Sequence, residues 1–487
     1  MNTPLRRVAY ACLALFGILL LQANYLQAYK ASAYLDDPRN GRVLLRTYDR
    51  ERGPITVGNG QERQAIAMSK ETTDTLKYLR TYANGPLYAP VTGFYSLVYG
   101  ASGIERNEDR VLSGEDDRLF VRRFSDAITG RAPQGGSIAL TINPKAQQAA
   151  FQALAGRRGA AVALDPRTGA ILALVSSPSY DPSLLSSHDP AKIAMAYKAL
   201  QNDPANPMLD RALNQTYPPG STFKLITAAA ALSAGTYTPQ TRIASPTVLA
   251  LPQTNQPLRN FGGESCGDGK TTTLADALRI SCNTAFGQLG LVLGATAVRK
   301  QAAAFGFGET DLFVPQRVSR SSYPDTLSPP QLAQAAIGQY DVRVTPLQMA
   351  MVAAGIANQG RLMTPYLVNE VQAPDFSRLD LAQPKPYRET TTPQVAAELT
   401  AMMELVVQSG TGTAAQIPGI RVAGKTGTAQ HAVGAAPHAW FIGFAPAQDP
   451  QIAVAVVVED GGLAGSEATG GQVAAPIAKA MFEAVLR

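Results

Sequence analysis

The run 218–235 constrains the fold of this chain more than any other stretch. Pro-Pro-Gly at 218–220 cannot continue a helix, whereas the apolar, alanine-rich residues that follow favour one, and Gly235 is a candidate C-cap. Ser221 therefore lies at or near a helix N-terminus. Because positions i and i+3 share one helix face, the amine of Lys224 can reach the Ser221 hydroxyl. The helix is apolar nearly all round, which predicts a core helix carrying a buried Ser–Lys pair.

Such a pair has a chemical use. A serine hydroxyl is a weak nucleophile until a base takes its proton, and a desolvated, neutral lysine can be that base. A single Ser-x-x-Lys match is nevertheless weak evidence, because a helix turn with a solvated lysine has the same sequence. Other motifs must decide between the two.

The N-terminus predicts a membrane anchor. Arg6 and Arg7 precede an apolar segment, 8–28, of about the 20 residues that a membrane-spanning helix needs. The arginines favour a cytoplasmic tail at 1–7 and export of the remainder, so we expect a single-pass plasma-membrane protein. The alternative is a cleaved signal peptide, because Ala-Ser-Ala at 31–33 resembles a cleavage site. That site lies far beyond the strongly apolar run, which favours the uncleaved anchor.

Composition excludes several functions. The net charge is +6, but only 16% of residues are charged and no basic run predicts nucleic-acid binding. The three histidines show no His-Glu-x-x-His spacing, so we expect no zinc hydrolase, metal or cofactor, and we expect a structural role for His438. Cys12 lies in the membrane segment. In an exported body Cys266 and Cys282 form either a disulfide, which we favour, or two buried thiols.

The rest of the chain predicts two units. Residues 29–154 mix short β-rich runs (42–45, 53–57) with polar segments, and a strand near 138–142 leads into an alanine-rich helix ending by Gly156. Residues 155–487 begin with two strands (159–164, 170–175) and end with three strands and a helix (421–430, 440–445, 452–459, 471–486). Helical periodicity dominates between them, as at 271–280, 283–294 and 345–358. One sheet built from both ends and covered by helices gives an α+β fold.

Two further motifs accompany Ser-x-x-Lys. Ser281-Cys282-Asn283 lies between two predicted helices, where a sharp turn projects a proton-relaying serine and an amide that can hold a substrate. Lys425-Thr426-Gly427-Thr428 lies in a predicted strand, with a positive charge, two hydroxyl donors and a glycine that leaves room beside the strand. Ser-x-x-Lys, Ser-x-Asn and Lys-Thr-Gly in this order are the signature set of penicillin-binding proteins and active-site-serine β-lactamases.

The same lysine also completes a P-loop pattern. Residues 419–426 match G-x-x-x-x-G-K-T. A P-loop needs a strand before the glycines and a helix from the lysine onward. Here the segment before the glycines (395–409) is helical and the segment after the lysine is β. Nucleotide binding is therefore excluded.

With the three motifs in place, the chain resembles a class B penicillin-binding protein, and most of all the actinobacterial penicillin-binding protein A type. The resemblance runs almost end to end and includes Pro38-Arg39-Asn40, Arg52-Gly53-Pro54-Ile55, Ala336-Ile337-Gly338-Gln339, Val344–Ala350 and Trp440–Phe444. It implies a penicilloyl-serine transpeptidase domain at 155–487, with a five-stranded sheet and an all-helical subdomain. It also implies a non-catalytic pedestal domain at 29–154, too short for a glycosyltransferase. Glu51 and Pro54 depart from the expected pedestal motif.

The resemblance also implies roles. Ser221 attacks the carbonyl between the last two D-alanines of a stem peptide, Lys224 is the base, Ser281 relays the proton to the leaving amine, and Lys425 tunes the local field. Asn283 and Gly427 bind substrate, while Thr426 and Thr428 bind its terminal carboxylate. The backbone N–H groups of Ser221 and Thr428 form the oxyanion hole. An amine of a second stem then completes the cross-link, and β-lactams acylate the same serine.

Alternatives remain open at this stage. A β-lactamase would hydrolyse its acyl-enzyme quickly, and the anchor and pedestal disfavour it. A D,D-carboxypeptidase differs only in using water as acceptor. A β-lactam sensor would need a cytoplasmic signalling portion, and an idle scaffold would not need three intact motifs. A SEDS-type glycan polymerase is the partner implied by the resemblance, in cell-wall synthesis, cell division or cell shape.

Overall fold

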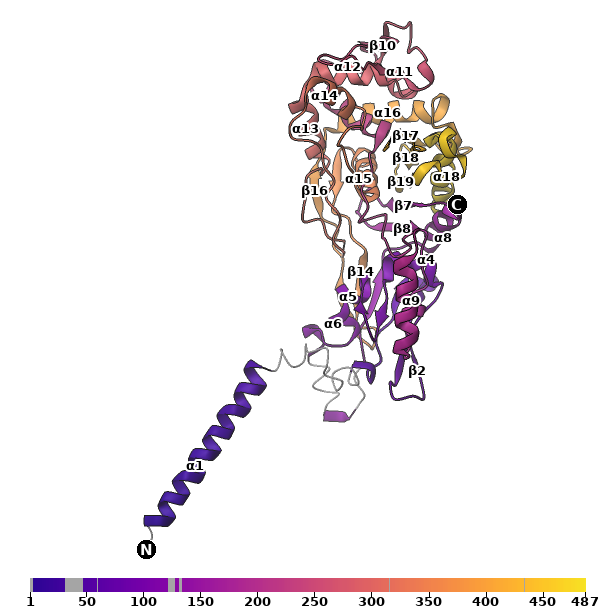
Figure 1. Cartoon of the computed structure of the whole chain (residues 1–487). Helices are drawn as coiled ribbons and strands as arrows, with labels where there is room; N and C mark the ends of the chain where they lie inside the picture. Colours follow the sequence, from indigo (N-terminus) through magenta and orange to yellow (C-terminus); the bar gives the residue numbers. More distant parts are fainter. Residues whose placement is uncertain are drawn as a thin grey trace.

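The computed structural model describes residues 3–30, 47–58, 60–120, 128–130, 134–314, 316–432 and 434–487. The body is elongated, with helix α1 (Thr3–Asn24) drawn apart from it (Figure 1). The predicted strand at 42–45, the Ala-Ser-Ala at 31–33 and Pro38-Arg39-Asn40 lie outside the described residues.

The N-terminal helix is longer than predicted. It begins at Thr3 rather than Val8 and continues through a π-helical turn, Tyr25–Tyr29, to give 27 residues long and apolar enough to cross a membrane. At 1.5 Å per residue this is about 40 Å, more than the roughly 30 Å of a hydrocarbon core. None of its side chains is buried. One N-terminal apolar helix therefore fits a membrane anchor.

A five-stranded antiparallel sheet forms the centre of the larger part. Its order is β17 (Ala423–Ala429), β18 (His438–Ala445), β19 (Ile452–Val458), β7 (Gly159–Leu164) and β8 (Ile171–Ser177). Every residue of β7, β18 and β19 is buried, which explains their continuous rather than alternating apolar sequence. The prediction of one sheet assembled from two early and three late strands is confirmed.

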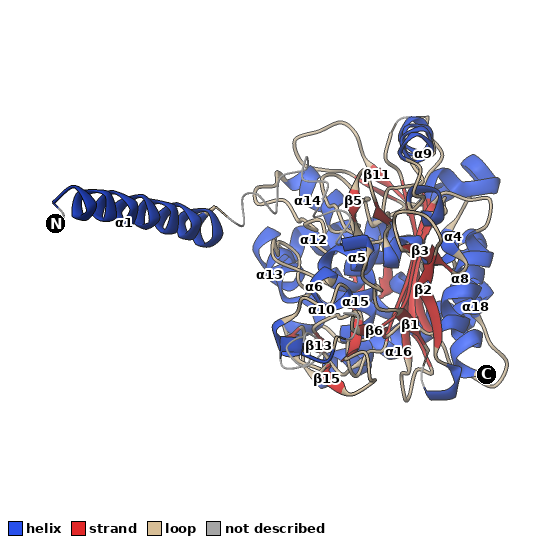
Figure 2. Ribbon diagram, turned by 90° about the horizontal axis from the view of Figure 1, so that it is seen from below, coloured by secondary structure: helices blue, strands red, loops and turns tan. Residues whose placement is uncertain are grey.

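Helices cover both faces of this sheet. Figure 2 shows α8 (Pro144–Leu154) and α18 (Ala475–Leu486) on one side, with α10 (Lys224–Ser233) and α15 (Pro346–Ala357) on the other. Successive residues of β18 divide between two cores, with Phe441 packing in the α8–α18 core and Trp440 in the α10–α15 core. α15 is buried at every position, as its unbroken apolar sequence requires.

The region between the early and late strands is mainly helical. It contains α11 (Leu274–Arg279), α12 (Asn283–Leu293), α13 (Ala295–Ala304), α14 (Pro329–Ala335) and α16 (Pro393–Ser409). The helix predicted from 271 begins only at Leu274, because Thr271–Thr273 form strand β12, which pairs with β9 (Arg242–Ala244). A second ribbon joins β10 (Val248–Leu249) to β11 (Leu258–Arg259). Runs of two or three residues carry too little periodicity to be predicted.

The pedestal contains a six-stranded sheet. Its order is β15 (Arg378–Leu381), β14 (Val368–Gln372), β6 (Ser137–Leu140), β1 (Ile55–Val57), β2 (Gln64–Glu71) and β3 (Tyr78–Tyr82). Two of these strands, β14 and β15, come from the predicted catalytic unit, whereas α8 from the predicted pedestal packs on the central sheet. The division at 154/155 stays a prediction. Each of the two predicted parts contributes elements to the sheet or core of the other.

Shorter elements complete the chain: α4 (Gly85–Thr92), β4 (Tyr95–Ser96), β5 (Gly100–Ala101), α5 (Gly103–Asn107), α6 (Asp109–Leu112), α9 (Pro190–Asn202), β13 (Arg361–Met363), β16 (Pro386–Glu389) and α17 (Gly470–Val473).

The Arg-Gly pair of the pedestal motif has a structural explanation. Arg52 is buried and contacts Glu105 and Asp109 at 2.6 Å each, while Arg80 contacts the other oxygen of Glu105 at 2.6 Å. A Cβ on Gly53 would lie 1.9 Å from a backbone oxygen of Gly136. The arginine is the centre of a buried ion-pair cluster, and the glycine lets a neighbouring chain segment pass.

Candidate active site

Ser221 lies in a short 3₁₀ turn, Gly220–Phe223, directly before α10. The prediction of a helix N-terminus is confirmed, with a tighter first turn than expected. Two hydrogen bonds hold the start of the turn: Gly220 N–H donates to Gly338 O (2.9 Å), and Trp440 Nε1 donates to Pro218 O (3.1 Å). Gly220 has a φ of +52°, which only glycine adopts readily. The serine is therefore held, partly exposed, on a fixed and largely buried turn.

Lys224 begins α10 and is fully buried. Its Nζ donates to Ser281 O (2.6 Å) and Asn283 Oδ1 (2.8 Å), and it lies 3.3 Å from Ser281 Oγ. Within the described residues these bonds lead to the second motif and not to the Ser221 hydroxyl, which the i,i+3 argument favoured. Helical spacing allows Lys224 to reach Ser221, but its amine bonds to Ser281 and Asn283 because tertiary packing places their oxygens within hydrogen-bond distance.

The second motif forms the sharp turn that its sequence predicts. Ser281 has a φ of +62°, in the left-handed region, and follows α11 closely, while Asn283 begins α12. Lys425 Nζ donates to Ser281 Oγ at 2.9 Å. The Ser281 hydroxyl thus bridges Lys224 and Lys425, so that residues from three distant segments meet at one oxygen.

The third motif lies on β17, which is an edge strand of the central sheet. An edge strand leaves alternate backbone N–H and C=O groups unpaired with its neighbour, so β17 has groups to offer a substrate. Lys425 is fully buried, and Thr428 is partly exposed. A Cβ on Gly427 would lie 3.0 Å from Pro219 O and 3.0 Å from Thr222 Cγ2, so the absent side chain makes room for the nucleophile turn. The contact of Gly427 with substrate stays a prediction.

Both lysines are poised to lose their protons. Burial lowers the pKa of Lys224 well below its usual value, and the charge of Lys425 lowers it further. Burial lowers the pKa of Lys425 to about 7. The expected like-charge effect is thus present, but desolvation is the larger cause. A neutral lysine with a free electron pair is what a general base requires.

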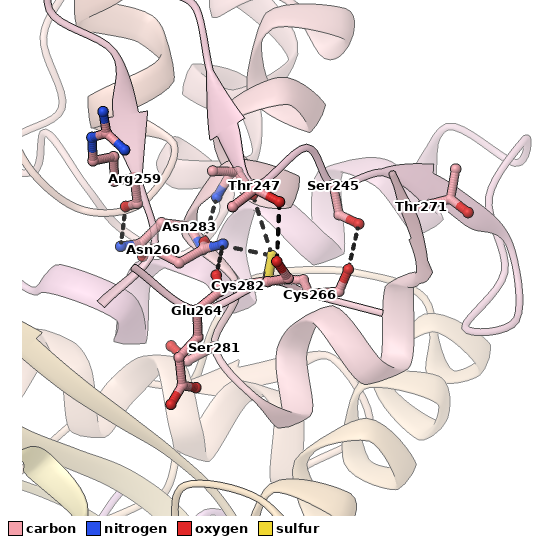
Figure 3. Close-up of a disulfide and its surroundings, with 12 residues drawn as sticks. Ser245, Thr247, Arg259, Asn260, Glu264, Cys266, Thr271, Ser281, Cys282 and Asn283 are labelled. Atoms are coloured by element: carbon pink, nitrogen blue, oxygen red, sulfur yellow. Dashed lines mark hydrogen bonds between the residues drawn. A yellow bond between two sulfur atoms is a disulfide. The ribbon is translucent and has the colours of Figure 1, made fainter. Parts of the chain in front are cut away.

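Cys266 and Cys282 form a disulfide with a Cα–Cα distance of 6.2 Å, as the favoured alternative predicted (Figure 3). It ties the 258–266 segment to the turn that carries Ser281. Asn260 lies in this segment, and its Oδ1 accepts the N–H groups of Asn283 (2.9 Å) and Thr284 (3.0 Å) at the start of α12. The bridge and this cap together hold the second motif in place.

Two site-supporting residues were missed by the sequence reasoning. Asn260 caps a helix from more than twenty positions upstream, and no local pattern marks such a residue. Thr411 Oγ1 lies 2.5 Å from Thr426 Oγ1 of the third motif. Its position in a Gly-Thr-Gly run after α16 is a turn signal, which gives no indication of a partner on β17.

The comparisons with known proteins agree with this geometry. Residues 159–483 match the penicillin binding protein transpeptidase domain. The chain belongs to this family. Residues 52–138 match the penicillin binding protein A dimerisation domain.

Two relatives are similar over the whole chain. Both carry the name peptidoglycan D,D-transpeptidase PbpA. That of Mycolicibacterium smegmatis is 49% identical over 495 residues, covering 100% of this chain and 99% of the relative. That of Mycobacterium tuberculosis H37Rv is 47% identical over 499 residues, with the same coverage.

The fold is also shared with solved structures. The ceftriaxone acyl-enzyme complex of penicillin-binding protein A from M. tuberculosis has a TM-score of 0.88 at 46% identity, over 91% of this chain and 100% of that one. A D,D-transpeptidase domain from Eggerthella lenta has a TM-score of 0.77 at 35% identity, over 90% of this chain and 98% of that one. The class B assignment and the α+β fold with a pedestal are confirmed.

Proposed function

We propose that this penicillin-binding protein is a peptidoglycan D,D-transpeptidase that cross-links stem peptides through an acyl-enzyme on Ser221 and is inhibited covalently by β-lactams. The observation that carries the proposal is the convergence of two buried lysines on Ser281, beside the nucleophile turn. A buried pair with lowered pKa values around a serine has the chemistry of acyl transfer. The names of the two full-length relatives support the same activity.

In the first half-reaction the Ser221 hydroxyl oxygen attacks the carbonyl carbon between the last two D-alanines, and its proton passes to neutral Lys224. The tetrahedral intermediate collapses as the C–N bond breaks, and the leaving amine takes a proton through Ser281. D-Alanine departs and the acyl-enzyme remains. In the second half-reaction an amine of a neighbouring stem attacks the ester, which forms the cross-link and returns the proton to the serine.

The other motif residues bind and orient the substrate in this proposal. Asn283 holds the penultimate amide, and Thr426 and Thr428 bind the terminal carboxylate, with Thr426 steadied by Thr411. The backbone N–H groups of Ser221 and Thr428 stabilise the oxyanion, which typically contributes about 3–4 kcal/mol per donor. Lys425 keeps the field around Lys224 positive and so favours its neutral form.

The proposed location is supported by the N-terminal helix. We place residues 8–28 across the plasma membrane as a single-pass anchor, with 1–7 in the cytoplasm and the catalytic body outside. The apolar helix Thr3–Tyr29 and the disulfide, which suits an exported compartment, support this arrangement. A SEDS-type glycan polymerase is the proposed partner, because a transpeptidase acts on the stem peptides of newly made glycan strands.

The test is covalent labelling of the full chain, purified in detergent, by a fluorescent penicillin. A stable label on the wild type that is absent from Ser221→Ala is expected. Rapid loss of label with turnover would point to a β-lactamase, and absence of label on folded wild type would overturn the enzyme and leave a scaffold. Incubation with a stem peptide, with and without an amine acceptor, then separates cross-linked product from the hydrolysed product of a D,D-carboxypeptidase.

A further inference from the structure

Three side chains outside the motifs meet at one end of the central sheet. His431 follows β17 closely, His438 is the first residue of β18, and Asp460 comes shortly after β19 ends. The sheet brings them together, because Ala429 pairs with His438 and Val458 pairs with Ala439. Asp460 lies 22 positions beyond His438 and the two histidines are seven positions apart, so the three residues match no metal-ligand spacing motif.

The distances among their donor atoms are those of a coordination site. His431 Nε2 lies 3.3 Å and His438 Nδ1 lies 3.8 Å from the same oxygen, Asp460 Oδ1. One donor atom from each residue lies within 4.8 Å of the others. Ligands bound tetrahedrally at about 2.0–2.2 Å are roughly 3.3–3.6 Å apart, so small movements close the set around one ion.

Neighbouring groups already orient two of the three. The Asp460 backbone N–H donates to His438 Nδ1 at 3.2 Å, so this nitrogen is unprotonated and its lone pair faces Asp460; a metal ion on Nδ1 would take the place of that amide hydrogen. Arg158 binds Asp460 Oδ2, so Oδ1 is the oxygen left to face the histidines. Hydrogen-bonded support of this kind is typical around metal ligands.

Two changes are required: the Asp460 N–H must leave His438 Nδ1, and one of the two rings must turn. The two imidazole rings are stacked, with centroids 4.0 Å apart and planes 5° apart, so a single ion cannot lie in both ring planes. His431 is exposed and lies beyond the end of β17, whereas His438 is buried in β18. His431 is therefore the ring that turns, and its Nε2 is already the nitrogen nearest to Asp460.

The cluster opens onto a cavity of about 420 Å³, which Tyr217 and Pro218 of the segment before the nucleophile also line. A three-ligand set beside open space leaves a coordination position for water. Two imidazoles and one carboxylate suit zinc and other late divalent transition metals, whereas calcium and magnesium prefer all-oxygen sites.

We propose that His431, His438 and Asp460 form a binding site for one divalent transition metal ion, with Zn²⁺ as the first candidate. Bound there, the ion joins the ends of β17 and β19 and stiffens the strand that carries the third motif. That consequence rests on the proposed function, whereas metal binding itself does not. The competing arrangement is a plain ion-pair cluster in which Arg158 alone holds Asp460.

The test uses the full chain in detergent, purified through a histidine-free tag and stripped with a chelator. Isothermal titration with Zn²⁺ is expected to give one site, and Co²⁺ is expected to give the visible absorption of a four-coordinate ion. His431→Ala and Asp460→Asn each remove a ligand and should weaken binding at least about 100-fold, since loss of a mere supporting partner costs about 10–100-fold. The matched control is His188→Ala, because His188 lies on another surface, 2.8 Å from Asp74.

Circular dichroism and a cooperative thermal melt report that every variant is folded. No Zn²⁺ binding by folded wild type at tens of micromolar metal would overturn the site, and so would equal binding by wild type and His431→Ala. A Zn²⁺-dependent change in acylation rate that His431→Ala abolishes would establish the link to β17. An unchanged rate in a protein that binds the metal would overturn that link. Failure of the proposed function is distinct, because it removes the label and not the titration.

Discussion

The pedestal and the active site both bury charged side chains, but with opposite partners. In the pedestal, Glu105 is 0% exposed and lies 2.6 Å from each of Arg52 and Arg80. In the active site, Lys224 and Lys425 are also 0% exposed, yet within the described residues their hydrogen bonds end on neutral oxygens. The side chains are equally buried, but Glu105 has oppositely charged partners and the two lysines have only neutral hydrogen-bond acceptors.

The consequences for ionisation are opposite. Burial alone would raise the pKa of Glu105, but the charges of Arg80 and Arg52 outweigh it and the pKa lies below its usual value. The lysines have no such partner, so their pKa values fall. A buried charge with an oppositely charged partner, such as Glu105, therefore maintains structure. A buried lysine without such a partner becomes a reactive base at a cost in stability.

The sharpest test removes the unpaired charge. Lys224→Met should slow penicillin acylation by about 10²–10⁴-fold, since a positioned general base contributes about that much. Its melting temperature should stay equal or rise, because a desolvated amine without a charged partner is replaced by an apolar chain of similar length. Stopped-flow labelling and thermal denaturation measure the two effects. Wild-type acylation in the variant would remove Lys224 from the mechanism.

Removing the charge of Glu105 should lower stability and leave the acylation rate unchanged. Glu105→Gln leaves two buried arginines without their shared carboxylate and should destabilise the protein by about 3–5 kcal/mol, whereas the folded fraction should acylate normally. Denaturant unfolding gives the free energy. Asp109→Asn is the matched control, because that carboxylate is half exposed and its ion pair with Arg52 contributes at most about 1 kcal/mol. Equal losses in both variants would contradict the buried-cluster account.

The disulfide supports the reactive region without any charge. Cys266 and Cys282 are 16 positions apart, and closing a loop of this size should contribute roughly 3 kcal/mol by the chain-entropy argument. Cys266→Ser, or reduction of the wild type, should lower the melting temperature and slow acylation, because the turn carrying Ser281 loses its tie. Cys12→Ser is the control, since that thiol is free and lies on α1. Acylation rates unaffected by reductant would show that the Asn260 cap suffices.

The pH profile should report the two lysines. Acylation requires neutral Lys224, so its rate should fall about tenfold per pH unit once the pH drops below the depressed pKa of this group. Above about pH 7 Lys425 loses its proton, and with it the charge that attracts a β-lactam carboxylate, so the rate should decline again. Lys425→Arg keeps its charge and should lack the alkaline limb. A profile that is flat from pH 5 to 9 would contradict the depressed pKa values.

Much of this arrangement could be predicted from the sequence. Strands β7, β18 and β19 were predictable because strands buried on both faces read as continuous apolar runs. The nucleophile turn was predictable because Pro-Pro-Gly ends one segment and an apolar helix begins the next. The disulfide and the turn at Ser281 were also predicted correctly. These features depend on residues near one another in the chain.

What could not be predicted depends on residues far apart. Asn260 caps α12 across a loop, and Lys224 bonds to Ser281 rather than to Ser221, because acceptors supplied by tertiary packing override helical spacing. The pairing of β14 with β6 joins segments more than two hundred positions apart, and neither strand carries a signal for the other. Asp460 meets His431 and His438 only because β17, β18 and β19 are neighbours in the sheet, and no local spacing of these residues indicates that.

The pairing of β14 with β6 limits where the chain can be cut to make a fragment that folds. A fragment beginning at 155 would keep β14 but lose β6, and its backbone hydrogen-bonding groups would face solvent along an open edge that invites aggregation. It would also lose α8 from its own core. The pedestal and the catalytic part should therefore melt as one cooperative unit. A soluble fragment should be cut ahead of β1, so that both partners of every pairing travel together.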